Sequence, residues 1–192
     1  MNGAVKLGLR MLSTFFKNYF DETLSGIRHF DQAAGNRVVK RIKNVQRQGG
    51  RVIIFGNGGS ASIASHAVVD LNKAAGVKAL CFTDPSLLTC FANDFGYENA
   101  YAKALEQHGT AKDLVVVISS SGQSENMIRV ARTALKLSCG LVTFSGFAED
   151  NPLRSLGEEN FYCPLLKYNM VENSHQVWLL AIVDAFIASN HQ

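Results

Sequence analysis

The sequence predicts an α/β fold in which a doubly wound, five-stranded parallel sheet is flanked by helices and preceded by a helical pair. Two observations support this prediction. From residue 51 onward, short apolar runs alternate with segments of helical spacing, which is the pattern of a parallel sheet. Before that point, residues 12–48 show helical spacing alone. We expect all 192 residues to form one domain, with helices used in oligomerisation over 1–50 and an α/β core over 51–192.

The leading helices are expected at residues 12–30 and from Asp31 to about Gln48. The first carries an unusually aromatic stripe at helical spacing, made of Leu12, Phe15, Phe16, Tyr19, Phe20, Leu24, Ile27 and Phe30. Such a stripe is usually core, but a helix that leads an α/β unit often packs on another subunit. We therefore expect a homotetramer. Asp31 is the expected N-cap of the second helix, and Gly49-Gly50 is its expected end.

Five apolar runs are the expected strands. They span residues 52–55, 78–83, 113–117, 140–144 and 160–164. Helices are expected at about 60–75, 86–91, 98–108, 127–135 and 169–189. Asp84-Pro85 provides an N-cap followed by a proline at the first helical position, and Asn93 to Gly96 is expected to break the helix that starts there. Ligands of doubly wound sheets bind at the carboxyl ends of the strands, so the loops after the first and third strands are the expected site walls.

Composition argues against several functional classes. Hydrophobic residues make up 47% of the chain and charged residues 18%, which is ordinary for a soluble globular protein. The net charge is only +3 and no block of lysine and arginine occurs, so we expect no nucleic-acid partner. We also expect no membrane partner, because no apolar run approaches the roughly 18 residues of a membrane span. The cysteines lie far apart and no signal peptide is recognisable, which favours free thiols in the cytoplasm.

The segment Ser119-Ser120-Ser121-Gly122-Gln123-Ser124 is the most informative part of the chain. It follows an apolar strand and opens a helix. Such a junction can offer hydroxyl groups, backbone N–H groups and the positive end of a helix dipole to one anion. One serine would be explained as a helix N-cap. Four serines around a glycine are more than a cap needs, so the segment predicts an anion site.

A second turn, Gly56-Asn57-Gly58-Gly59-Ser60, follows the first predicted strand. Its glycines permit positive φ and a close approach of the backbone to a ligand. The spacing matches neither the GxGxxG dinucleotide fingerprint nor a Walker loop, so we expect no nucleotide cofactor. A plain tight turn between strand and helix remains the alternative.

Three other polar groups have both a functional and an ordinary interpretation. His66 and Asp70 lie four residues apart on one helix face. They could form an acid–base pair, provide two metal ligands, or only share a surface hydrogen bond. Asn93-Asp94 is either a site wall or a turn. Glu172 and His175 lie three residues apart on the last helix, a spacing that is most often found on a solvated face.

The two turns, together with His66 and the segment Ala92-Asn93-Asp94-Phe95-Gly96 between them, resemble SIS-domain (sugar isomerase) proteins in residue type and order. The branch with the strongest resemblance is that of the phosphoheptose isomerases, and the likeness covers nearly the whole chain. It implies the SIS fold, which is flavodoxin-like. It also implies the reaction of that branch, which interconverts sedoheptulose 7-phosphate and D-glycero-D-manno-heptose 7-phosphate.

The resemblance further implies which residues bind the substrate. The phosphate would be held by Ser119, Ser121 and Ser124, with Ser120 and Gly122 shaping the loop. The sugar hydroxyls and phosphate would meet Asn57, Gly58 and Ser60. The remaining substrate-binding positions would be Asn93, Asp94 and Asn169, the last of which stands where an aspartate is usual in the family.

The chemistry implied by the resemblance is proton transfer through an enediol, which needs a base near neutral pKa and an acid or a metal. Glu172, where a glutamine is usual, is the expected base, and His66 or His175 the expected acid. Asp70 stands where the isomerases use a catalytic glutamate. His66, Asp70 and Glu172 together would hold Zn²⁺ through one nitrogen and two carboxylates. Leu180 stands where the isomerases carry a second catalytic and metal-binding histidine, which predicts weaker zinc binding or none.

Two functions therefore remain open. In the first, the chain is a phosphosugar isomerase whose product is used for lipopolysaccharide or capsule. In the second, it is a non-catalytic SIS module that binds a sugar phosphate or docks on a partner, as the replication-initiator-associating branch does. The ionisable groups of His66, Asp70, Asp94 and Glu172 favour the first function, and Leu180 favours the second.

Overall fold

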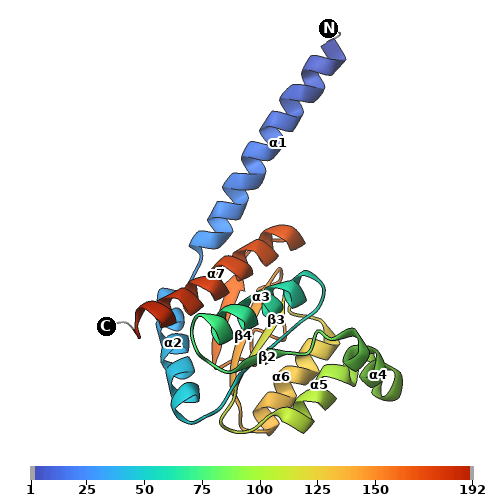
Figure 1. Cartoon of the computed structure of the whole chain (residues 1–192). Helices are drawn as coiled ribbons and strands as arrows, with labels where there is room; N and C mark the ends of the chain where they lie inside the picture. Colours follow the sequence, from blue (N-terminus) through green and yellow to red (C-terminus); the bar gives the residue numbers. More distant parts are fainter. Residues whose placement is uncertain (1–2, 191–192) are drawn as a thin grey trace.

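The computed structural model describes the backbone of residues 3–190 and the side chains of residue 12 and residues 14–190. Its strands are β1 (Val52–Gly56), β2 (Ala79–Cys81), β3 (Leu114–Ser119), β4 (Gly140–Gly146) and β5 (Glu159–Cys163). They form one parallel sheet in the order β2-β1-β3-β4-β5 (Figure 1). The predicted fold class is confirmed, and the order reverses direction after β1, as in a doubly wound sheet.

Helices cover both faces of the sheet. They are α1 (Gly3–Arg28), α2 (Gln32–Arg47), α3 (Gly59–Lys73), α4 (Pro85–Phe95), α5 (Tyr97–His108), α6 (Glu125–Lys136) and α7 (Tyr168–Ala188). One hydrophobic core lies between the sheet and α2, α3 and α7, and a second lies between the sheet and α4, α5 and α6 (Figure 1). Every residue of β1 and β3 is buried, because helices cover the sheet on both sides.

Helix α1 projects away from the body of the domain, and only its last turns lie against α7 (Figure 1). The Trp178 indole N–H donates to the Ile27 carbonyl at 2.7 Å and ties this end of α1 to α7. Most of the aromatic stripe is exposed, including Phe15, Phe16 and Phe20, the last at 60%. Most of the stripe is therefore outside this chain's own core, whereas Phe30 at its end packs against Phe161 and Trp178. The expected homotetramer remains a prediction.

The local signals placed most helix ends correctly. Asp31 accepts the Ala34 N–H at 2.9 Å and caps α2, and Asp84 caps α4 ahead of Pro85. The expected break over Asn93 to Gly96 is confirmed at its last residue: α4 continues through Asn93 and Asp94, and the chain turns at Gly96, where φ is +78°. Asparagine and aspartate tolerate an exposed last turn, so the glycine alone ends the helix. Among the described residues, no helix is long and apolar enough to cross a membrane.

Candidate ligand-binding site

The two turns predicted to form the site are brought together by the sheet. Strands β1 and β3 are neighbours, with Gly56 paired to Ile118, so the loops that follow them leave the sheet side by side. Between these loops and the first turns of α7 lies a pocket of about 90 Å³. It is lined by Asn57, Ser60, Ile118, Ser119, Ser120, Ser121, Ser124, Tyr168 and Glu172. Seven of these nine residues were predicted site residues.

A glycine gives the serine loop its shape. Gly122 has φ of +64°, and its N–H donates to the Ser119 carbonyl at 3.0 Å. A Cβ at this position would lie 1.9 Å from Asn151 Oδ1, and the Gly122 carbonyl accepts the Leu153 N–H at 3.1 Å. A side chain is therefore excluded on two grounds, the positive φ and the contact with Asn151. The neighbouring segment fixes the loop in the conformation that exposes its serines to the pocket.

The hydroxyl groups of the loop are not consumed by capping. Ser124 is the N-cap residue of α6, yet its side chain makes no capping bond to the described backbone. Its Oγ lies 3.3 Å from Ser119 Oγ instead. Ser120 is buried, and its Oγ has no hydrogen-bond partner among the described residues. A buried hydroxyl without a partner costs free energy, which a bound ligand or water would relieve. These features favour the anion site over the ordinary N-cap.

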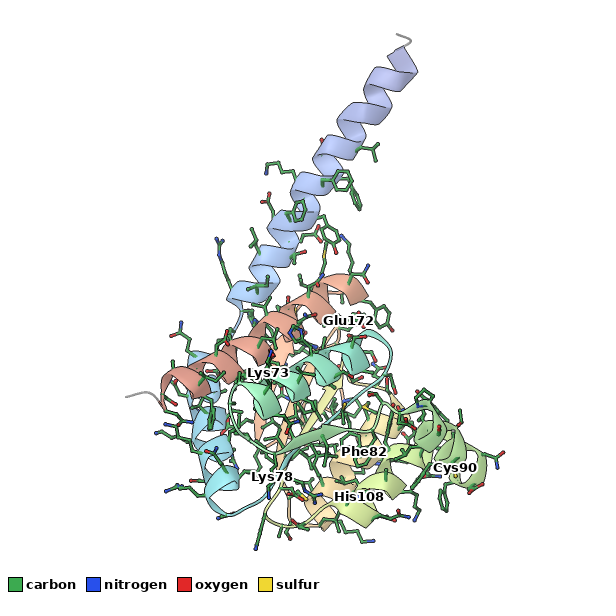
Figure 2. All side chains as sticks on the ribbon, viewed as in Figure 1. Lys73, Lys78, Phe82, Cys90, His108 and Glu172 are labelled. Carbon is green, nitrogen blue, oxygen red and sulfur yellow. The ribbon has the colours of Figure 1, made fainter. Side chains whose placement is uncertain are left out.

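The glycine turn places a carboxylate at the start of a helix. Gly58, with φ of +52°, leads into α3, which begins at Gly59. A Cβ on Gly59 would lie 2.2 Å from Glu172 Oε2, so the carboxylate rests directly on the backbone of the first turn of α3. Figure 2 shows Glu172 where the first turns of α7 and α3 meet. Only glycine allows this approach, which the sequence could not reveal because Glu172 lies over a hundred residues away.

Burial raises the pKa of the Glu172 carboxyl above its ordinary value. The carboxyl is partly withdrawn from water, which disfavours its charged form. A carboxyl with a raised pKa beside a polar pocket accepts a proton more readily than an exposed glutamate does.

Asn57 is held by residues that sequence reasoning missed. Its amide pairs reciprocally with the amide of Asn126, with bonds of 3.0 and 2.9 Å, and the Tyr97 hydroxyl donates to Asn57 Oδ1 at 2.9 Å. Tyr168, also missed, lines the pocket. The one available signal was a polar residue, Asn126, directly before the buried pair Met127-Ile128 of α6.

His66 and Asp70 lie outside the pocket lining. His66 Nε2 is 3.4 Å from Asp70 Oδ2, and its Nδ1 is 3.4 Å from the Gln176 side-chain nitrogen. This exposed contact joins α3 to α7. It lies about 10 Å along α3 from Gly59, since each helical residue rises about 1.5 Å. The geometry matches the surface hydrogen bond that was the ordinary interpretation of this pair, and the roles of His66 and Asp70 in catalysis stay predictions.

The predicted catalytic role of His175 is wrong for this structure. Its ring is completely buried, packs against Phe144 and Trp178, and bonds to the Ser145 carbonyl at 3.0 Å. Burial lowers the pKa of His175 to about 4, the bond to Ser145 opposing this only in part. The histidine faces the sheet because it stands four residues after the buried Val171, on the apolar stripe of α7.

The other predicted substrate-binding residues are exposed and lie outside the pocket lining. Asn93 donates to its neighbour Asp94 at 2.9 Å on α4, a helix without buried residues. Asn169 lies in the first turn of α7, and Gly58 in the turn before α3. Their contacts with a substrate remain predictions.

The predicted zinc ligands do not converge within the described residues. No group of three histidine, cysteine, aspartate or glutamate side chains there is arranged to hold a metal ion. His66 and Asp70 form a pair, but the Glu172 carboxylate is engaged at Gly59. Leu180 packs against the core beside α3. The donor set in one chain therefore does not fit the tetrahedral site that zinc prefers, and we derive no step through a metal.

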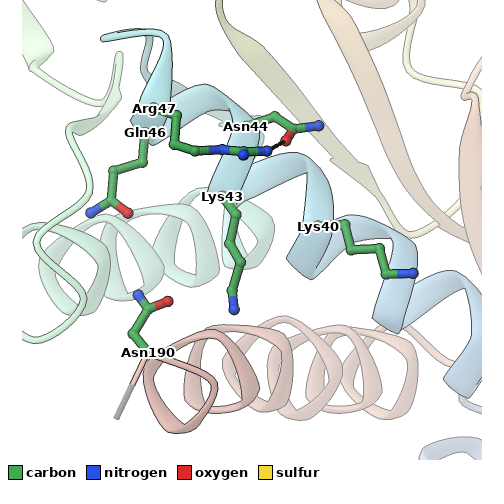
Figure 3. Close-up of a pocket in the computed structure, with 6 residues that line it drawn as sticks. All are labelled: Lys40, Lys43, Asn44, Gln46, Arg47 and Asn190. Carbon is green, nitrogen blue, oxygen red and sulfur yellow. Dashed lines mark hydrogen bonds between the residues drawn. The ribbon is translucent and has the colours of Figure 1, made fainter. Parts of the chain in front are cut away.

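A larger pocket, of about 460 Å³, lies at the other end of α7. Figure 3 shows its lining, which consists of Lys40, Lys43, Asn44, Gln46 and Arg47 on α2 and of Asn190. Because α7 has 21 residues, the two pockets are separated by about 30 Å along the helix. Lys43 donates to the Ser189 carbonyl at the end of α7, and Arg47 donates to the Asn44 side chain near the end of α2. Both cations therefore stabilise helix C-termini. The chemistry of the serine pocket, rather than the size of this one, identifies the candidate site.

The comparison with protein families decides the affiliation. The sequence model of the SIS domain matches residues 15–146. The chain belongs to the SIS domain family. This match covers both turns of the pocket and the whole of β1 to β4.

Individual relatives agree with this affiliation. A phosphoheptose isomerase of Fusobacterium nucleatum is 30% identical over 154 residues, which cover 77% of this chain and 78% of the relative. A phosphoheptose isomerase of Helicobacter pylori strain Shi470 is 37% identical over 136 residues, which cover 68% of this chain and 69% of the relative. The solved structure of the phosphoheptose isomerase from Neisseria gonorrhoeae matches with a TM-score of 0.83 and 20% identity, over 93% of this chain and 98% of that one. At that identity the structural likeness establishes the shared SIS fold.

Proposed function

We propose that this SIS-domain protein is a sugar-phosphate isomerase that interconverts sedoheptulose 7-phosphate and D-glycero-D-manno-heptose 7-phosphate. The proposal rests on one observation: the same pocket holds serine hydroxyls that are not used to cap a helix and a carboxyl group with a raised pKa. The names of the relatives support the same substrate class.

The serine loop provides the phosphate end of the pocket. A phosphate dianion placed there would accept hydrogen bonds from Ser119, Ser121 and Ser124, and would lie at the N-terminus of α6. It would also give Ser120 Oγ the partner that the described residues lack. Helix dipole and hydroxyl donors act together in a partly desolvated site, where each is stronger than in water.

Glu172 provides the base. In an aldose–ketose isomerisation, a base removes a proton from the carbon beside the carbonyl and returns it to the former carbonyl carbon, while a second proton moves between the two oxygens. The Glu172 carboxylate lines the same pocket as the serines, so it lies at the sugar end when the phosphate lies at the loop. Its raised pKa brings its proton affinity closer to that needed at neutral pH.

His66 is the remaining candidate acid. It lies on the α3 surface outside the pocket lining, so its participation requires a substrate long enough to reach beyond Gly59, or a closer approach of α3 in a homotetramer. The exposed aromatic stripe of α1 supports such an assembly. The proposed setting is the cytoplasm, in a pathway that supplies heptose for lipopolysaccharide or capsule.

The direct test is to incubate the protein with sedoheptulose 7-phosphate, with and without zinc, and to follow aldose formation by NMR. Conversion that disappears in Glu172→Gln supports the proposal. Thermal stabilisation by the sugar phosphate without any conversion would overturn the isomerase and support the non-catalytic binding module.

A matched pair of variants separates phosphate binding from helix capping. Ser124→Ala is expected to weaken sugar-phosphate binding by at least about tenfold and to leave the melting temperature nearly unchanged, because its hydroxyl does not cap α6. Asp31→Ala removes a side chain that does cap, and it should cost about 1 kcal/mol of stability without affecting binding. Equal loss of stability in the two variants would mean that Ser124 is an ordinary cap.

A further inference from the structure

The amides of Asn57 and Asn126 join the two loops of the pocket. Asn57 Nδ2 donates to Asn126 Oδ1 at 3.0 Å, and Asn126 Nδ2 donates to Asn57 Oδ1 at 2.9 Å. Asn57 stands in the turn after β1, and Asn126 in the first turn of α6. Asn126 is 4% exposed, so its amide is committed to this contact.

Two further donors fix which way each amide points. The Met127 N–H donates to Asn126 Oδ1 at 3.1 Å, and the Tyr97 hydroxyl donates to Asn57 Oδ1 at 2.9 Å. A backbone N–H can only donate, so it requires the oxygen of Asn126 at that position. The reciprocal pair then requires the oxygen of Asn57 to face Asn126 and Tyr97. The network itself therefore assigns the orientation of both amides.

Counting hydrogen bonds shows what Asn57 has left for a ligand. A side-chain amide oxygen has two lone pairs, and those of Asn57 are both occupied, by Asn126 and by Tyr97. The amide nitrogen has two hydrogens, and the described residues use one of them. Asn57 lines the pocket, so the group it presents there is a single N–H donor.

We propose that Tyr97 and Asn126 are positioning residues that make Asn57 a hydrogen-bond donor only, which binds an acceptor oxygen of the sugar phosphate. This inference rests on the proposed function and adds the polarity of one contact to it. The acceptor is a carbonyl, hydroxyl or phosphate oxygen, and Asn57 Oδ1 cannot accept a hydrogen bond from a sugar hydroxyl. Tyr97, the first residue of α5 after Gly96, thereby acts on the site without lining it.

Tyr97→Phe is the main test because it removes one oxygen from a half-exposed ring. We expect sugar-phosphate affinity, measured by calorimetry, and KM to worsen about 3- to 10-fold, the usual effect of one lost hydrogen bond. The kcat and the melting temperature should change little. Tyr101→Phe, one turn further along α5 and outside the pocket lining, is the matched hydroxyl deletion and should leave affinity, KM and kcat unchanged.

A spectroscopic readout reports the donor directly. In ¹⁵N-labelled protein, the side-chain NH₂ signals of Asn57, identified by their loss in Asn57→Asp, should shift when the sugar phosphate is added. The same signals should start from a different position in Tyr97→Phe. A protein that binds the sugar phosphate but shows neither the affinity change nor the shift overturns this inference alone. A wild-type protein that neither binds nor converts the sugar phosphate overturns the proposed function and the inference with it.

Discussion

The burial of His175 makes a quantitative prediction about acid stability. The ring lies in the core between α7 and the sheet, where its Nε2 bonds to the Ser145 carbonyl at 3.0 Å. Its pKa is lowered from 6.5 to about 4, mainly because burial disfavours the charged ring. Replacing it with glutamine, which stays neutral and can still donate to Ser145, removes this titration from the folded state.

The sign and size follow from proton linkage. Between about pH 6.5 and pH 4 the unfolded chain carries a proton on His175 and the folded chain does not, so stability falls as the pH falls. The stability that the neutral, buried His175 allows is fully present above about pH 6.5. It is lost as the pH falls to the folded pKa of about 4. The difference amounts to about 3 kcal/mol, since each pKa unit is worth about 1.4 kcal/mol.

The assay is urea unfolding of the wild type and His175→Gln at pH 7 and pH 4. His175→Gln also loses ring contacts with Phe144 and Trp178, which should cost about 1–3 kcal/mol at both pH values. The informative quantity is therefore the change in the wild-type minus variant difference, which should move by about 3 kcal/mol in favour of the variant at pH 4. Ile182→Val, a core change on the same helix without a titratable group, should cost about 1 kcal/mol at either pH.

One result would refute the reasoning. If the wild-type minus variant difference stays within about 0.5 kcal/mol between the two pH values, as expected for Ile182→Val, His175 is not a buried neutral ring. The assignment of this histidine to the core, and its removal from the candidate acids, would then both fail.

The remaining predictions concern the two glycines of the site and its carboxylate. Gly59→Ala places a methyl group 2.2 Å from Glu172 Oε2, so kcat/KM should fall at least about tenfold, with little change in the melting temperature because alanine suits a first helical turn. Gly122→Ala combines positive φ with a clash at Asn151, so the free energy of unfolding in urea should fall by more than about 2 kcal/mol. Gly76→Ala also has positive φ but lies in open space, so it should lower the same quantity by about 1–2 kcal/mol. Because the pKa of Glu172 is raised, activity should decline on the acid side at a higher pH than an exposed glutamate would give, and a pH–rate profile that is flat to pH 4 would contradict its role as base.

The sequence predicted features that depend on neighbouring residues. The caps at Asp31 and Asp84, the buried strands and the two turns at the carboxyl ends of β1 and β3 all follow from short patterns. The position of His175 was also available, because Val171, His175 and Trp178 follow the helical period of one buried stripe. Its expected role as an acid came from the chemistry that the resemblance implies and not from this stripe, which places the ring in the core.

Contacts between distant segments could not be predicted in the same way. Asn57 and Asn126 are 69 residues apart, and Glu172 reaches Gly59 from a separate helix. No periodicity encodes such pairs, because they depend on the order of the strands and on how each helix is rotated against the sheet. The same limit applies to His66, whose face of α3 is directed toward Gln176 rather than into the pocket.

The two helices that begin at the pocket have different roles, and this difference bears on the chemistry. The Glu172 carboxylate already covers the positive end of α3. At the positive end of α6 the carboxylate of Glu125 is paired with Arg129 at 2.7 Å, and the pocket side is lined by serine hydroxyls. A substrate dianion will therefore be directed to α6, and within a pocket of about 90 Å³ it must lie close to Glu172. A like charge at that range disfavours ionisation of the carboxyl, so phosphate binding will raise the pKa of Glu172 beyond the effect of burial alone. In the proposed reaction, phosphate binding at one helix end thus makes Glu172 at the other end a stronger proton acceptor at the moment when the sugar is in place.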